Sequence, residues 1–171
     1  MSKTIVVYFS HAGENYFSGT IKSIPVGNAA KLAQAIAQAL DAQAFEIVPT
    51  NPYPSNYRAC VDRAREELAA GARPEVAALP NISEASTVIL GYPNWCGTIP
   101  MPVATVLQAL DWNGKTIAPF CSNEGSGMGS SEADIRKLAP GATVVRGLSV
   151  FGGKTDESLD AAIAWAKRAQ H

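Results

Sequence analysis

Cysteine is scarce in this chain of 171 residues, which has only Cys60, Cys96 and Cys121. They form no Cys-x-x-Cys pair, which argues against a zinc site. An odd number of widely spaced thiols also argues against a disulfide framework. We therefore expect reduced thiols and no bound metal.

Long apolar runs and a strong net charge are also lacking. No stretch reaches the roughly 18 consecutive apolar residues that suggest a membrane span, and residues 1–4 show no basic region of an export signal. The 14 basic and 15 acidic side chains are mixed along the chain and leave a net charge of -1. No basic stripe is available to neutralise nucleic-acid phosphates. These absences predict a cytoplasmic protein with neither membrane nor nucleic acid among its partners.

The composition, with 47% hydrophobic and 17% charged residues, is typical of a globular protein. We expect one domain over residues 1–171. Apolar runs predict strands over 4–9, 44–48, 87–90, 116–121 and 143–145, and residues 149–151 are either a short extra strand or an irregular approach to the last helix. Apolar periodicity predicts helices over 28–40, 56–70, from Pro100 or Pro102 to about 110, over 132–138 and around Leu159, Ala162, Ile163 and Ala166.

Five repeats of strand followed by helix predict an α/β fold with a parallel sheet between two helical layers. In a five-stranded sheet of order 2-1-3-4-5, the chain reverses its direction of travel between strands one and three, which leaves a crevice at the carboxyl ends of the strands. The loops after the first, third and fourth strands are rich in Gly, Ser, Asn and aromatic residues. We therefore expect one binding site where these three loops meet.

The loop after the third strand, residues 91–98, places Trp95 in a glycine-hinged polar turn. An indole in this position suits a flat ring that stacks on one face and meets backbone donors along its edge, as a flavin does. The alternative is that Trp95 is a core residue beneath a helix. Cys96 is either a nucleophile or an ordinary loop thiol, and the sequence shows no base beside it.

The first loop leads from Ser10 into the helix that starts at Asn28. The free amides and positive dipole of a helix start favour a phosphate group. The alternative is that Asn28 is only a helix cap and Ser10 only a turn residue.

Four motifs resemble those of the flavodoxin family: Tyr8-Phe9-Ser10-His11-Ala12-Gly13, Gly27-Asn28-Ala29, Gly91-Tyr92-Pro93-Asn94-Trp95 and Gly114-Lys115. The resemblance covers nearly the whole chain and implies a flavodoxin-like three-layer α/β/α sandwich that binds flavin mononucleotide (FMN). The FMN contacts that we expect from the three loops are Ser10, His11, Ala12, Gly27, Asn28 and Ala29, then Pro93, Asn94, Trp95, Cys96 and Gly97, and finally Ser122, Asn123, Glu124, Gly125 and Ser126.

The sequence departs from the family pattern in the first and third loops. Residues 14–26 are inserted into the phosphate loop and are either a lid over the site or an ordinary surface excursion. Ala29 stands where the family usually has a threonine, whose hydroxyl bonds the phosphate. Ser10, Ser18, Thr20 or a water would have to supply that hydrogen bond instead. No tyrosine stands in the third loop to cover the flavin ring, so either the ring is more exposed or Tyr16 of the insertion covers it.

The resemblance implies electron transfer to redox partner proteins or to a small-molecule acceptor. The alternatives are an FMN-dependent NAD(P)H:quinone or small-acceptor oxidoreductase, and a binding module that has lost its cofactor. Gly97 would let the backbone reorient beside the flavin as it is reduced. With no Lys or Arg expected beside the flavin to balance its anionic reduced form near the phosphate, we expect a low second reduction potential and single-electron transfer.

Overall fold

The computed structural model describes residues 3–171. Met1 and Ser2, the first residues of the predicted domain, lie outside the described residues. The strands of the main sheet are β1 (Thr4–Tyr8), β4 (Gln43–Glu46), β5 (Thr87–Pro93), β6 (Thr116–Asn123), β7 (Thr143–Val144) and β8 (Leu148–Phe151). The helices are α1 (Asn28–Leu40), α2 (Tyr57–Ala70), α3 (Met101–Ala109), α4 (Ser131–Leu138) and α5 (Thr155–Ala169), with a 3-10 helix η1 (Gly152–Lys154) before α5.

The main sheet has the order β4-β1-β5-β6-β7, and β8 also pairs with β6. Every pairing is parallel. Counted among the predicted strands, this order is 2-1-3-4-5, as expected for a flavodoxin-like fold. The alternative of a short extra strand at residues 149–151 is confirmed as β8, and β7 and β8 pair with successive parts of β6. Pro119 of β6 lies between those two parts and has no N–H to donate to a ladder.

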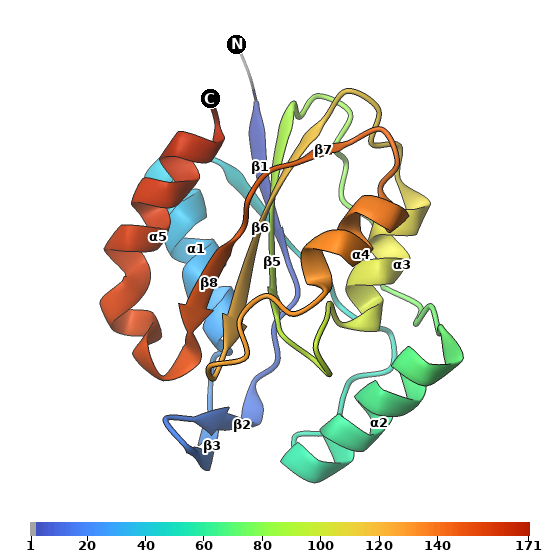
Figure 1. Ribbon diagram of the computed structural model, residues 1–171, viewed down its shortest axis with the longest axis vertical. Coiled ribbons are helices and arrows are strands. Elements are labelled where there is room, and N and C mark those ends of the chain that lie inside the picture. The colour runs from blue at the N-terminus through green and yellow to red at the C-terminus, as the bar shows by residue number, and fades with distance from the viewer. Residues whose placement is uncertain (1–2) are drawn as a thin grey trace.

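Helices cover both faces of the sheet (Figure 1). One face carries α1 and α5, and the other carries α3 and α4. The predicted helix over 28–40 is confirmed, and its buried stripe includes Leu32, Ala33 and Ile36, spaced so that one side of α1 meets the sheet. The two apolar clusters on opposite faces of the sheet hold the α/β/α layers together.

The position of α2 differs from the expected alternation, in which every helix flanks the sheet. This helix stands off towards the carboxyl ends of the strands, near β2 (Figure 1). Only Cys60 and Ala64 of its 14 residues are buried. With so little apolar side-chain area to bury, α2 has little drive to pack flat on the sheet.

The insertion folds as an antiparallel hairpin of β2 (Gly13–Phe17) and β3 (Thr20–Ile24). It lies beneath the carboxyl ends of the main strands, at the end of the molecule away from both chain termini (Figure 1). An isolated two-stranded hairpin is marginally stable in water. Contacts with the rest of the chain must therefore hold it in place.

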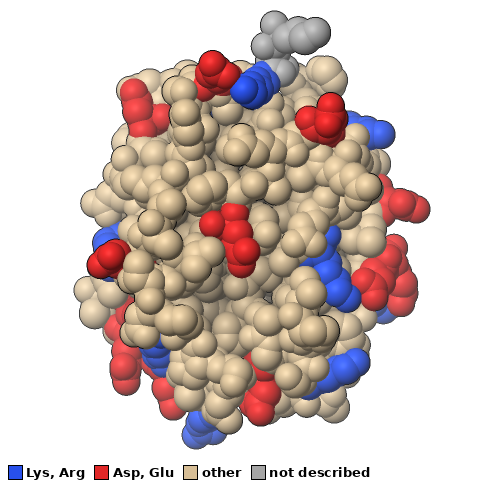
Figure 2. Space-filling model, turned by 180° about the vertical axis from the view of Figure 1, so that it is seen from behind, with Lys and Arg blue, Asp and Glu red and all other residues tan. Residues whose placement is uncertain are grey.

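The surface carries no extensive region of one charge on the face shown in Figure 2, where acidic and basic side chains are interspersed. This distribution agrees with the net charge of -1. Within residues 3–171, none of the helices combines the length and apolar character needed to cross a bilayer.

Candidate functional site

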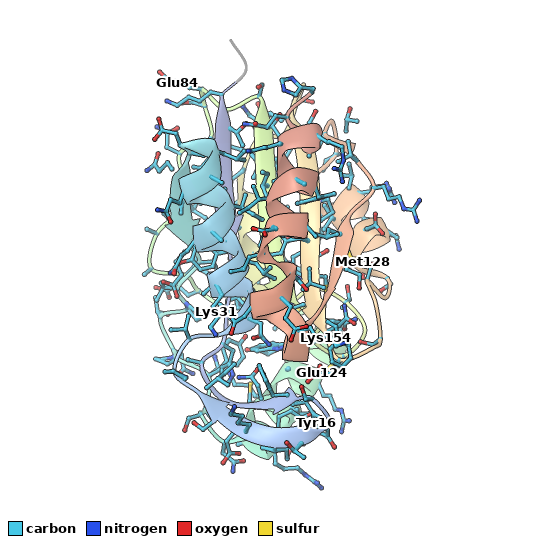
Figure 3. All side chains as sticks on the ribbon, turned by 90° about the vertical axis from the view of Figure 1, so that its left-hand side faces the viewer. Tyr16, Lys31, Glu84, Glu124, Met128 and Lys154 are labelled. Carbon is cyan, nitrogen blue, oxygen red and sulfur yellow. The ribbon has the colours of Figure 1, made fainter. Side chains whose placement is uncertain are left out.

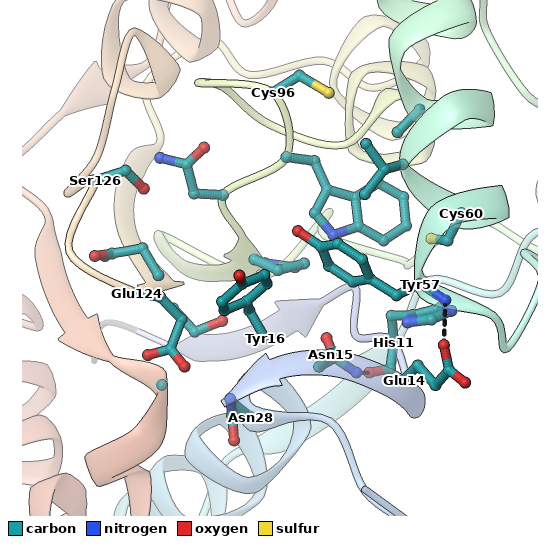
Figure 4. A pocket seen from close by; sticks show the side chains of 18 of the residues that line it. His11, Glu14, Asn15, Tyr16, Asn28, Tyr57, Cys60, Cys96, Glu124 and Ser126 are labelled. Atoms are coloured by element: carbon teal, nitrogen blue, oxygen red, sulfur yellow. Dashed lines mark hydrogen bonds between the residues drawn. The ribbon is translucent and has the colours of Figure 1, made fainter. Parts of the chain in front are cut away.

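A pocket of about 340 Å³ opens at the carboxyl ends of the strands, where the three loops were predicted to meet (Figure 4). Its volume lies within the range of small-molecule sites. The predicted residues that line it are His11, Asn28, Pro93, Asn94, Trp95, Cys96, Ser122, Asn123, Glu124 and Ser126. All three loops therefore contribute to one cavity.

Other predicted residues do not line this pocket: Ser10, Ala12, Gly27, Ala29, Gly97 and Gly125. The Ser10 hydroxyl accepts a hydrogen bond from the amide of Ala30, 3.1 Å away, and so caps α1. A Cβ on Gly27 would lie 2.1 Å from that hydroxyl, which explains the glycine. The methyl group of Ala29 is buried in the apolar cluster beneath α1. A cofactor contact by any of these residues stays a prediction.

The start of α1 fits the phosphate or ribityl end of a nucleotide. The Ala30 amide donates to Ser10 Oγ, and the Lys31 amide donates to the Gly27 carbonyl. The amides that precede them, at the very start of the helix, have no partners within the helix. Asn28 lines the pocket, and its Oδ1 is buried without a hydrogen-bond partner among the described residues. A buried unpaired oxygen is costly, and a ligand hydroxyl would satisfy it.

Trp95 belongs to an aromatic cluster at the floor of the pocket. Its ring meets those of Tyr53, Phe9 and His11 edge-on, with centroid separations of 4.8, 5.1 and 5.8 Å. It is half-buried and also packs against the main core. The indole therefore anchors its loop on the core and also lines the pocket, and its contact with a flavin stays a prediction.

The loop that carries Trp95 closes in a tight turn. Trp95 and Thr98 exchange backbone hydrogen bonds of 3.0 and 3.2 Å. Both central residues have positive φ, 55° at Cys96 and 84° at Gly97, as in a type I′ turn. The Asn94 side chain accepts from the Gly97 amide at 3.0 Å, and the Ser130 amide donates to the Gly97 carbonyl at 2.8 Å. Polar contacts on both sides therefore fix the turn.

The third loop is organised by Asn123. Its Oδ1 accepts from the amides of Gly125 and Gly127, both at 3.0 Å, while its Nδ2 donates to Ser149 Oγ at 2.8 Å. The buried Asn123 amide therefore shapes the loop from within.

The inserted hairpin is attached on both sides of the pocket. At its base, Glu14 accepts from the Tyr57 amide at 2.8 Å, the contact dashed in Figure 4. At its tip, the Ser18 amide donates to Glu124, which also accepts from the Gly153 amide. Figure 3 shows Glu124 between the hairpin that carries Tyr16 and the start of α5 at Lys154. The insertion thus spans the pocket, and Glu14, Asn15 and Tyr16 line it.

The wall formed by α2 was missed by sequence reasoning. Tyr57, Cys60, Val61, Ala64 and Arg65 line the pocket, and this spacing corresponds to one face of a helix. The ring of Tyr57 meets that of Tyr16 edge-on, with centroids 5.4 Å apart. The helical spacing is visible in the sequence, but the sequence does not show what this face would contact.

Arg65 changes the charge expected at the site. None of the loop residues that line the pocket is Lys or Arg, yet α2 brings a guanidinium to its wall. The expectation of a site with no balancing cation was therefore wrong. It considered only the loops, and α2 reaches the site through tertiary structure.

Burial favours the neutral forms of the histidine and of the two cysteines that line the pocket. Burial lowers the pKa of His11 and outweighs the opposing effect of its hydrogen bond with the Pro54 carbonyl. Burial raises the pKa of Cys60 to about 11 and also raises the pKa of Cys96, despite the nearby Arg65. Neither thiol is activated as a nucleophile, which favours the ordinary loop thiol at Cys96.

The comparisons with known proteins agree with the fold. A family model described as flavodoxin matches residues 3–167. Crystal structures of putative flavoproteins from Bacteroides uniformis and Bacteroides eggerthii are each 25% identical to this chain, with TM-scores of 0.75 and 0.72. Their alignments cover 97% and 95% of this chain and 98% of each of theirs.

A Lactobacillus acidophilus flavoprotein, crystallised in complex with FMN, is 18% identical with a TM-score of 0.65. The alignment covers 92% of this chain and 98% of that one. No curated protein matched the sequence.

Proposed function

Because the chain belongs to the flavodoxin family, we propose that it binds FMN and transfers electrons through it. The observation that carries this proposal is the unpaired Oδ1 of Asn28 at the start of α1, in a pocket that also holds Trp95. A helix start suits a phosphate, an unpaired buried oxygen suits a ribityl hydroxyl and an indole suits the flavin ring. The FMN named for the Lactobacillus flavoprotein supports the same ligand.

Each part of the site has a distinct role in this proposal. FMN, when bound, supplies the redox chemistry. The first amides of α1 and the Asn28 side chain hold the phosphate and ribityl end, and Trp95 lies against the ring. The hairpin and α2 exclude water from the other side of the pocket, where Tyr16 and Tyr57 meet.

The second candidate function is the transfer of electrons to a small-molecule acceptor. The hairpin and α2 around the pocket favour such an acceptor over a large protein partner. Residues of the hairpin and of α2 line the pocket together with the flavin-binding loops. A protein partner would meet these elements first, whereas a small molecule can enter a pocket of about 340 Å³. An FMN-dependent reductase of quinones or similar acceptors fits this arrangement.

Titration of the apoprotein with FMN tests the proposal. Calorimetry should show one binding site, and flavin fluorescence should be quenched because Trp95 contacts the ring. A protein that releases no heat with FMN and leaves its fluorescence unchanged would contradict it. Rapid oxidation of NAD(P)H by the loaded protein would favour the enzyme, and reduction in separate one-electron steps would favour the carrier.

A further inference from the structure

Arg65 has no ion-pair partner in the described part of the chain. The salt bridges there involve Lys3, Lys31 and Arg63. Arg65 instead lies beside the Cys96 thiol on the pocket wall. An arginine without a carboxylate partner is available to pair with an anionic ligand in the pocket.

The other charged side chains of the pocket wall are Glu14 and Glu124, and backbone amides hold both. Glu14 accepts from the amide of Tyr57, and Glu124 accepts from the amides at the hairpin tip and at Gly153. Both carboxylates are therefore engaged with backbone amides, and neither forms a salt bridge with Arg65.

The neighbours of Arg65 differ from those at the expected phosphate end. Asn28 and Gly152 mark that end, at the starts of α1 and η1. Cys96, the neighbour of Arg65, follows Trp95 in the loop that is expected to contact the flavin ring. Arg65 therefore lies beside the loop that is expected to contact the flavin ring.

We propose that Arg65 stabilises the anionic reduced form of the bound flavin. This inference rests on the proposed function, since it requires FMN in the pocket. Oxidised flavin has a neutral ring, and the uptake of two electrons and one proton leaves the ring with one negative charge. A cation beside the ring therefore binds the reduced form more tightly than the oxidised form, and raises the reduction potential.

The proposal reverses the expectation of single-electron transfer. A site without a cation disfavours the second electron, because it adds negative charge near a phosphate. Arg65 removes part of that penalty, which favours transfer of electrons in pairs. Paired transfer suits a small organic acceptor such as a quinone, which takes up two electrons and two protons.

The test compares Arg65→Gln with Arg58→Gln in the FMN-loaded protein. Arg58 is an exposed arginine of the same helix outside the pocket wall. Affinity for oxidised FMN is measured by fluorescence quenching, and the midpoint potential by equilibration with dithionite and a reference dye.

Arg65→Gln should leave the affinity for oxidised FMN within about twofold and weaken the binding of reduced FMN roughly tenfold. For a two-electron couple, that ratio lowers the midpoint potential by about 30 mV. Arg65→Lys should restore most of the potential, and Arg58→Gln should not change it.

An unchanged potential in Arg65→Gln, or an equal shift in Arg58→Gln, would overturn the role of Arg65. Failure of the wild-type protein to bind FMN at all would instead refute the proposed function. The two failures are therefore distinguishable.

Discussion

The carboxylate of Glu124 accepts a hydrogen bond of 2.6 Å from the backbone amide of Ser18, at the tip of the hairpin. Its second oxygen accepts from the amide of Gly153 at 3.3 Å. One side chain of the third loop therefore joins the insertion to the start of η1 and α5. Because Tyr16 of the same hairpin lines the pocket, this contact bears on how long a ligand stays bound.

Replacement Glu124→Ala should accelerate FMN release roughly tenfold. Hydrogen bonds to a charged group contribute about 1.5–3 kcal/mol, and the lower value applies at this partly exposed position. Stopped-flow measurement of flavin fluorescence recovery gives the rate. The control Glu66→Ala removes an exposed carboxylate of α2 that does not line the pocket. Equal release rates in both variants would show that the hairpin contact does not retain FMN.

Replacement Trp95→Leu should weaken FMN binding by roughly tenfold and abolish much of the fluorescence quenching. Contacts between an aromatic side chain and a planar ring contribute on the order of 1 kcal/mol or more. The apoprotein should also lose stability, because the indole packs on Tyr53 and Phe9. Trp165→Leu is the control, since that indole packs beside Phe120 in the other core. Full quenching by the Trp95 variant would place the flavin ring elsewhere.

Gly97→Ala should reduce the free energy of unfolding by about 1 kcal/mol and alter the separate one-electron potentials. The site leaves open space for a methyl group, so the cost comes from the φ of 84° alone. Gly71→Ala is the matched control, because its φ is 60°, its surroundings are equally open and it ends α2 away from the pocket. Thermal unfolding should show similar losses in both variants. Identical potentials in the two would remove any role of the Gly97 backbone in redox chemistry.

Stability should fall as the solution becomes mildly acidic, because burial lowers the pKa of His11 below the usual value of about 6.5. The ordinary value applies to His11 in the unfolded chain, and the lowered value applies to the folded protein. At a pH between the two, the unfolded chain binds more protons than the folded one, so the free energy of unfolding decreases as pH falls through this window. Urea unfolding of the apoprotein between pH 7.5 and 5.5 measures the slope.

His11→Gln should flatten this pH dependence. The control His171→Gln should retain it, since His171 is exposed at the end of the chain. A slope that survives in His11→Gln would assign the effect to other groups.

The inserted hairpin illustrates the limit of local reasoning. Residues 14–26 are recognisable as an insertion, and both a lid and a surface excursion were compatible with their sequence. The structure shows a hairpin held in place at Glu14 and at Ser18. The partner of Ser18 is Glu124, which lies 106 positions further along the chain. Such pairings depend on how the loops are brought together, so no short stretch of sequence contains them.

The sequence by itself determined the alternation of strands and helices and the three loops of the site, and its resemblance to the flavodoxin family supplied the strand order. Apolar runs, helical periodicity and turn residues are local signals, and the handedness of crossovers leaves few ways to assemble them. Tertiary structure alone decided that α2 stands at the pocket and brings Arg65 beside Cys96. The physical reason is that α2 has little apolar surface, so its place depends on the sum of weak contacts with distant segments.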